Sequence, residues 1–307
     1  MRLRLLPAGL LLLAVCAPAF AADTAAAPWW SWPLALFAVS FALGIVAVLA
    51  GVGGGVLFVP MIAGFFPFHL DFVRGAGLLL ALSGSLAAAP ALLRAGMANL
   101  RLAMPFALVG SVTSIVGALV GLALPTAIVQ TALGAIILAI AALMWRSKRS
   151  EYPEVAKSDR LSELLGLRGV FHDPATGRTA EWRVHRSPAG LAAFAGIGFL
   201  AGMFGLGAGW ANVPVLNLLL GVPLKVSVAT SGLMLSIIDT SAAWVYVHRG
   251  AVLPMITVPS IVGVMLGAGI GARLLRIVRA AVIRRFVIAL LAAAGLRALM
   301  KGLGVWP

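Results

Sequence analysis

The chain has 307 residues, of which 62% are hydrophobic and only 10% are charged. A soluble domain carries charge on roughly a quarter of its residues, so this composition excludes an ordinary soluble protein and predicts an all-α polytopic membrane protein. The excess of 23 Lys and Arg over 9 Asp and Glu does not indicate nucleic-acid binding. The basic residues lie between apolar runs, where they orient the chain and meet anionic lipid headgroups.

The N-terminus has the pattern of a secretory signal peptide. Two arginines precede an apolar stretch that ends in small residues at Ala21, so we expect residues 1–21 to be removed and the mature N-terminus to be periplasmic. An uncleaved first helix is the alternative. Cys16, the single cysteine, lies in this segment, and its removal would exclude disulfide and thiol chemistry.

Apolar blocks and helices follow in two series. The first series is a block over residues 33–66, broken at Gly51–Gly55, and then helices predicted over residues 75–94, 102–122 and 126–145. A polar insert occupies residues 147–188. The second series is a broken block over residues 189–221 and then helices predicted over residues 226–247, 252–274 and 282–300.

The two series repeat one another at an offset of 154 residues. Four positions of the first glycine-rich stretch, Gly51, Gly53, Gly55 and Pro60, recur as Gly205, Gly207, Gly209 and Pro214. This duplication predicts two membrane repeats, over residues 28–146 and 189–301.

The segment after each glycine stretch is too short to cross a bilayer. Residues 55–66 and 209–221 reach about 18 and 20 Å as helices, whereas a crossing needs about 30 Å. Because proline fits best in the first turn of a helix, Pro60 and Pro214 are expected to shorten the segments further. Each broken block is therefore predicted to be a re-entrant hairpin that enters and leaves on the same side.

Charge favours inverted over parallel repeats. With the N-terminus outside, each repeat contributes one hairpin and three crossings, which places the insert and the loop carrying Arg101 in the cytoplasm. Arg74 and Arg249 then fall in outward loops, where we expect them to be solvated, with the attraction of anions as the alternative. Arg297 and Lys301, near an outward C-terminus, do not fit this charge rule.

The insert differs in kind from the membrane repeats. Residues 158–167 are predicted to form a short amphipathic helix with Ser158 or Asp159 as N-cap. Residues 169–184 read as a β-hairpin with its turn at Pro174–Gly177. We expect the insert to be a cytoplasmic cap or interaction element.

The glycines predict an anion site at the centre of the membrane. Non-helical backbone is tolerated there only where protein buries it or where it lines a polar cavity. Short helices that begin after the glycines would point free N–H groups and positive dipole ends at an anionic substrate. The alternative is that the glycines serve only close helix packing.

A few polar residues near the predicted centre are further candidates. Asn212 would donate to an anion or tie the hairpin to a neighbour, and Thr230 and Ser231 would contact a ligand or cap a helix. Asp239 is the only acid well inside a predicted span. A buried carboxyl group there suits proton coupling, although a static hydrogen bond within the bundle is the alternative.

Three stretches, "GVGGGVLFVPMI", "GLGAGWANVPVL" and "KVSVATSGLMLS", resemble the paired signatures of the TauE/SafE sulfite exporter family. The resemblance covers residues 35–300 apart from the insert and implies transport of sulfite, sulfonate or thiosulfate across a bacterial inner membrane. The positions that carry it are Gly51, Gly53, Gly54, Gly55, Pro60, Gly205, Gly207, Gly209, Pro214, Ala229, Thr230 and Ser231. Ala208 replaces a glycine, and the first-half counterpart of residues 229–231 is Arg74-Gly75-Ala76, so the half-sites are unequal.

We therefore predict a secondary transporter or permease for a small sulfur-containing oxyanion that needs no cofactor and no metal. The alternatives are a membrane-embedded enzyme acting on a lipid phosphate and an accessory membrane subunit. An enzyme would need acids, His or Arg grouped for phosphoryl chemistry, and the predicted spans offer one buried acid. Oligomeric state, transport direction and the exact substrate are not predicted.

Overall fold

The computed structural model describes residues 28, 30–50, 53–94, 98–146, 153, 155, 157–172, 179–274 and 280–305. The predicted signal peptide, Gly51 and the hairpin turn at residues 174–177 lie outside the described residues. The first half contains α2 (Ser31–Ala50), α3 (Gly54–Phe65), α4 (Leu70–Arg94), α5 (Leu100–Ala123) and α6 (Thr126–Arg146). The second half contains α8 (Ser187–Phe204), α9 (Gly209–Pro214), the π-helix η2 (Val215–Leu219), α10 (Leu224–His248), α11 (Pro254–Leu274) and α12 (Ala280–Gly302).

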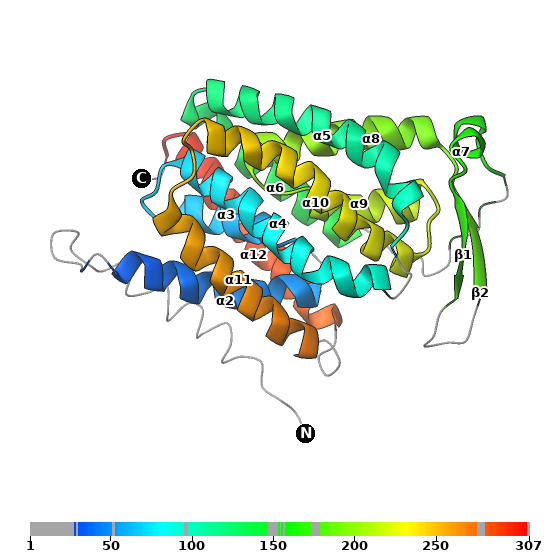
Figure 1. The fold of residues 1–307 in the computed structure, drawn as a ribbon. Helices are drawn as coiled ribbons and strands as arrows, with labels where there is room; N and C mark the ends of the chain where they lie inside the picture. Colours follow the sequence, from blue (N-terminus) through cyan, green and yellow to red (C-terminus); the bar gives the residue numbers. More distant parts are fainter. Residues whose placement is uncertain are drawn as a thin grey trace.

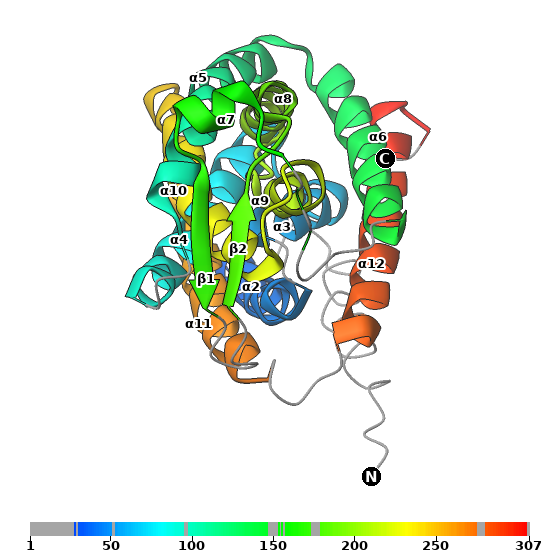
Figure 2. The same cartoon turned by 90° about the vertical axis from the view of Figure 1, so that its right-hand side faces the viewer.

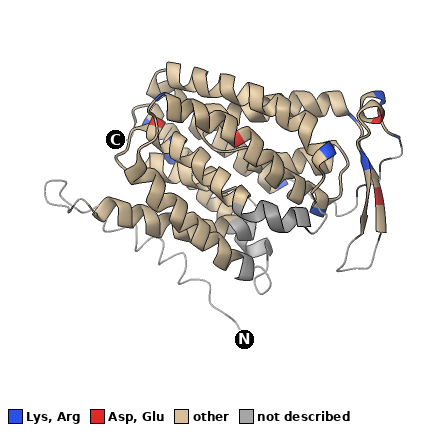
Figure 3. Ribbon diagram, viewed as in Figure 1, with Lys and Arg blue, Asp and Glu red and all other residues tan. Residues whose placement is uncertain are grey.

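The helices form a polytopic membrane bundle (Figure 1). Among the described residues, five helical stretches are long and apolar enough to cross a bilayer, namely α5, α6, α8, α10 and residues 254–271 of α11. Apart from Asp239 within α10, the charged residues of the described part of the chain gather at the ends of the bundle and on the insert (Figure 3). This distribution is typical of a protein whose helix sides face lipid.

Corresponding helices of the two halves pack in corresponding ways. Helix α2 packs along α11, and α8, its counterpart in the second half, packs along α5, the counterpart of α11. Helix α4 packs against α10, and α6 packs against α12. Glycines allow the closest approaches between these helices. A Cβ atom on Gly117 of α5 would collide with the carbonyl group of Phe199 in α8. A Cβ atom on Gly267 of α11 would collide with the carbonyl group of Phe41 in α2. Small residues let membrane helices pack this closely.

The two segments that follow the glycine stretches are short and central. Helix α3 has 12 residues and is buried from Gly55 to Gly64, as expected of a helix that is apolar on all faces. The expectation that Pro60 shortens it is wrong, because α3 continues past Pro60 to Phe65. Pro214 ends α9, and the chain continues directly as the π-helix η2, so the helical segment extends beyond its proline.

Helix α4 begins five residues before its predicted start, and this changes the role of Arg74. The sequence placed Asp71 and Arg74 in an outward loop, but Arg74 is only 1% exposed and pairs with Asp71 one helical turn away. Arg249 is exposed as predicted. The solvated role expected for Arg74 is therefore wrong.

Two cations that did not fit the charge rule bind the C-terminal end of α3. Arg297 Nε donates to the carbonyl of Gly64 at 2.6 Å, and Lys301 Nζ donates to that of Ala63 at 3.4 Å. The last carbonyls of a helix lack intrahelical partners and form the negative end of its dipole. Positive charge at this position thus stabilises a helix end instead of marking a cytoplasmic surface.

The insert forms the predicted short helix and hairpin and lies across one end of the bundle, in front of α10 and α4 in Figure 2. Helix α7 (Arg160–Leu164) precedes strands β1 (Arg168–His172) and β2 (Thr179–Arg183), which pair antiparallel with Gly169 opposite Trp182. Phe171 and Trp182 are buried in the same apolar cluster as Phe106 of α5 and Leu220, which follows η2. The hairpin is therefore anchored beside the end of the second short segment.

Asp159, one of the two predicted N-cap residues, is the N-cap of α7, but its side chain makes no capping hydrogen bond to that helix. Its Oδ1 atom accepts a hydrogen bond of 2.9 Å from the hydroxyl of Ser187, the first residue of α8. Burial alone would raise the pKa of Asp159, but hydrogen bonds with Ser187 and Ser162 and with the backbone together outweigh it and lower the pKa. The carboxylate thus ties the insert to the start of α8 in its charged form.

Candidate functional site

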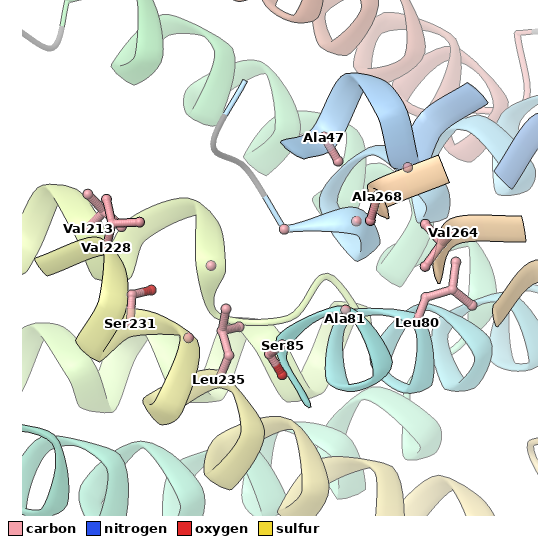
Figure 4. Close-up of a pocket in the computed structure, with 16 residues that line it drawn as sticks. Ala47, Leu80, Ala81, Ser85, Val213, Val228, Ser231, Leu235, Val264 and Ala268 are labelled. Atoms are coloured by element: carbon pink, nitrogen blue, oxygen red, sulfur yellow. The ribbon is translucent and has the colours of Figure 1, made fainter. Parts of the chain in front are cut away.

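A cavity of about 210 Å³ lies between the two short segments and the helices around them. Its walls come from α2, α3, α4, α9, α10 and α11, so both halves of the chain contribute. Figure 4 shows Val213, Val228 and Ser231 on one side of the cavity and Leu80 and Val264 on the other. The remaining lining residues are Gly44, Ala47, Gly53, Gly54, Ala81, Gly84, Ser85, Gly209, Gly232, Leu235 and Ala268.

The beginnings of α3 and α9 meet at this cavity. Gly53 is the N-cap of α3 and has no side chain to satisfy the first-turn N–H groups. Gly209, the first residue of α9, packs so closely that a Cβ atom on it would lie 3.3 Å from the backbone nitrogen of Gly53. First-turn N–H groups have no partner within their helix and carry the positive end of its dipole. The meeting point therefore offers hydrogen-bond donors and partial positive charge.

The polar side chains of the cavity are hydroxyls. Ser231 of α10 and Ser85 of α4 line it, and the Ser85 hydroxyl donates 2.9 Å to the carbonyl of Leu82. No Lys, Arg, Asp or Glu occurs among the described residues that line the cavity. The chemistry on offer is uncharged donors between apolar walls, which suits a small anion held by dipoles rather than by ion pairs.

Four of the predicted site residues line the cavity, namely Gly53, Gly54, Gly209 and Ser231. Among the described residues, the other candidates lie outside the lining: Gly55, Pro60, Gly205, Gly207, Asn212, Pro214, Thr230 and Asp239. Ser85 was not among the candidates. It lies one helical turn after Ala81, another lining residue that the sequence did not single out, so no local pattern identified this face of α4.

Three of the glycines outside the lining shape the backbone that leads to it. Gly205 and Gly207 have φ angles of +69° and +70°, which glycine adopts without the strain that a Cβ atom brings. A Cβ atom on Gly55 would lie 2.7 Å from the carbonyl oxygen of Leu206. These glycines allow the turn between α8 and α9 to pack against α3.

Thr230 has a structural partner. Its Oγ1 atom accepts 3.1 Å from the backbone N–H of Asn99, the N-cap of α5. Helix α10 begins at Leu224, so Thr230 and Ser231 lie in its second turn and the helix-capping alternative for them is wrong. Asn212 is fully buried, and neither polar atom of its side chain has a hydrogen-bond partner in the described part of the chain.

The family model of the sulfite exporter TauE/SafE matches residues 36–298. The chain belongs to the TauE/SafE family. Its members are membrane transporters of sulfur-containing anions and not enzymes, so the lipid-phosphate enzyme is set aside. Searches of curated proteins and of solved structures gave no significant match.

In this TauE/SafE protein Asp239 lies in the middle of α10 and does not line the cavity. It is fully buried, and a Cβ atom on Gly207 would lie 3.0 Å from its Oδ2 atom. The N–H of Ala208 interacts with the carboxyl group, but within the described residues neither oxygen has hydrogen-bond geometry to any partner. An acid against the glycine turn is thus placed to respond to a change at that turn.

Proposed function

We propose that the protein is an inner-membrane secondary transporter that moves sulfite, a sulfonate or thiosulfate through the cavity between α3 and α9. The observation that carries the proposal is the meeting of two helix beginnings at a cavity whose described lining residues include no charged side chain. Such a site holds an anion by backbone N–H groups and hydroxyls. Because it forms no full ion pair, it also releases the anion readily, as transport requires.

We assign direct substrate contact to Gly53, Gly54, Gly209, Ser231 and Ser85, and extend the first glycine turn to Gly51. The remaining candidates act on the substrate indirectly, by shaping the short segments: Gly55, Pro60, Gly205, Gly207, Asn212, Pro214 and Thr230. This division follows the lining of the cavity.

The two repeats, over residues 28–146 and 189–301, are proposed to be inverted and to alternate access around the cavity. The matching pairs α2–α11 and α8–α5 support an exchange of the two halves. We place the mature N-terminus in the periplasm, after a cleaved signal peptide over residues 1–21, and the insert (residues 147–188) in the cytoplasm. Exposed Arg101 and Arg146 at the insert end of the bundle support this orientation.

Transport by the purified protein tests the proposal. Protein reconstituted in liposomes is expected to move labelled sulfite, taurine or thiosulfate down an imposed gradient, with protein-free liposomes as the control. Transport without a second protein would also set aside the accessory-subunit alternative. Absence of flux for all three anions, with the protein correctly folded in the liposomes, would contradict it.

Replacement of Asp239 by Asn is expected to uncouple transport from a pH gradient. A carboxylate beside the turn would repel an incoming anion, and a protonated carboxyl group would not, so proton binding and anion binding favour one another. In Asp239→Asn, we expect downhill sulfite flux to persist while acceleration by an inward pH gradient is lost. Thr240→Val, at an exposed neighbouring position, is the control that keeps the coupling. Equal acceleration in Asp239→Asn and wild type would remove Asp239 from the coupling mechanism.

A further inference from the structure

Arg74 is the most deeply buried cation in the described part of the chain. Its guanidinium lies in an apolar bundle, where a charge is costly unless it is paired and hydrogen-bonded. Asp71 supplies the opposite charge, the carbonyl of Gly121 accepts from Nη2 at 3.2 Å, and the ring of Tyr246 lies 5.7 Å from the guanidinium carbon. The side chain is thus fixed by contacts with α5 and α10 as well as with its own helix.

The principal partner of this group is the end of α8. Nη1 of Arg74 donates 2.8 Å to the carbonyl of Met203. The hydroxyl of Tyr246, also fully buried, lies 3.0 Å from the carbonyl oxygen of Gly202 and 3.3 Å from that of Met203. The last carbonyls of a helix have no partner within the helix and form its negative end. Arg74 and Tyr246 together satisfy the carbonyls of Gly202 and Met203.

Two residues after Met203, at Gly205, the chain reaches the turn that leads to the cavity. A Cβ atom on Gly205 would lie 2.5 Å from the Cα atom of Arg74, and one on Gly77 would lie 2.5 Å from the carbonyl oxygen of Gly205. Gly207 then packs against Ala81, also on α4. Helix α4 therefore contacts this path at Met203, Gly205 and Gly207. The path continues to the beginning of α9, which lines the cavity at Gly209.

We propose that Arg74 and Tyr246 are positioning residues for transport, which act on the substrate through the Gly205–Ala208 turn and the place it gives to Gly209. This inference rests on the proposed function of the cavity. Neither side chain lines the cavity. Their effect is to fix the N–H groups at the beginning of α9 relative to those of α3, and a loss of about 1 Å in such placement weakens a site held by dipoles.

The test compares Arg74→Lys and Tyr246→Phe with Arg249→Lys, a control at an exposed arginine near the end of α10. All variants carry Cys16→Ser, which removes the single native cysteine. Lysine keeps the charge of Arg74 but lacks the planar fork whose Nη1 donates to Met203 and whose Nη2 donates to Gly121. We expect the KM for sulfite to rise roughly fivefold in both test variants, equivalent to about 1 kcal/mol, with wild-type behaviour in Arg249→Lys.

A second readout does not depend on the substrate. With Ser231→Cys as a reporter in the cavity wall, the rate of labelling by a small thiol reagent is expected to change about threefold in both test variants, since the beginning of α9 shifts. A lower melting temperature with unchanged KM and unchanged labelling would show that the pair only stabilises the fold, and would overturn the proposal. If the wild type moves none of sulfite, taurine and thiosulfate, the proposed function fails, and the labelling comparison still decides whether the pair positions the turn.

Discussion

Replacing Gly209 by Leu is expected to reduce transport by about tenfold or more, which corresponds to a loss of about 1.4 kcal/mol in substrate stabilisation. A Cβ atom at this position would already lie 3.2 Å from Cδ1 of Leu235 and 3.3 Å from the nitrogen of Gly53. The rest of a leucine side chain has to enter the cavity, where it covers the first-turn N–H groups. Sulfite flux per folded molecule in liposomes is the measurement.

The matched control is Gly269→Leu on α11, where the glycine is exposed and a Cβ atom meets nothing within 4 Å. Both variants add the same side chain to a helical glycine, but only the first adds it to the cavity. Flux close to wild type is expected in the control. Wild-type flux in Gly209→Leu as well would mean that the substrate passes elsewhere.

Replacing Gly205 by Ala is expected to destabilise the protein by about 2–5 kcal/mol. Alanine at a φ of +69° costs about 1–2 kcal/mol, and the new methyl group adds an overlap that costs about 1–3 kcal/mol, because it would lie 2.5 Å from the Cα atom of Arg74. The neighbour is backbone and cannot rotate away. Thermal unfolding in detergent, followed with the yield of monodisperse protein, measures the effect.

Gly250→Ala separates the two causes. Gly250 also has a positive φ, +67°, but a Cβ atom there meets nothing within 4 Å. We expect this variant to lose only the conformational part, about 1–2 kcal/mol. Equal losses in the two variants would show that the turn does not pack against α4 as described.

Much of the architecture follows from local patterns in the sequence. Apolar runs and glycine stretches predict the helices and their breaks, and turn residues around Pro174 predict the pairing of β1 with β2, which is confirmed. The prediction that Pro60 shortens its segment fails because α3 is buried and its neighbours pack against it on all sides. Surrounding packing then outweighs the cost that Pro60 imposes on an isolated helix.

The partners of charged residues are the part that the sequence does not predict. Arg74 reads as a loop residue because its main acceptor, Met203, lies 129 positions away in the chain. Arg297 is separated from its acceptor Gly64 by 233 positions. Nothing in a local pattern shows which helix end such a cation will satisfy, since that depends on how the two halves pack.

The duplicated glycines lead to a cavity that both halves of the chain line, and four of the predicted site residues are part of its lining. That this cavity binds substrate stays a prediction. Which glycines face the cavity and which face a neighbouring helix depends on the rotation of each segment. Gly55 follows Gly54 directly, yet it packs against the carbonyl of Leu206.

Selenite, the selenium analogue of sulfite, tests the central claim most directly, because anomalous diffraction locates selenium in crystals of the protein grown with it. The account predicts one anomalous peak between the beginnings of α3 and α9, within hydrogen-bonding reach of the first-turn N–H groups after Gly53 and at Gly209. Selenite bound at saturation anywhere else, with this cavity empty, would contradict it.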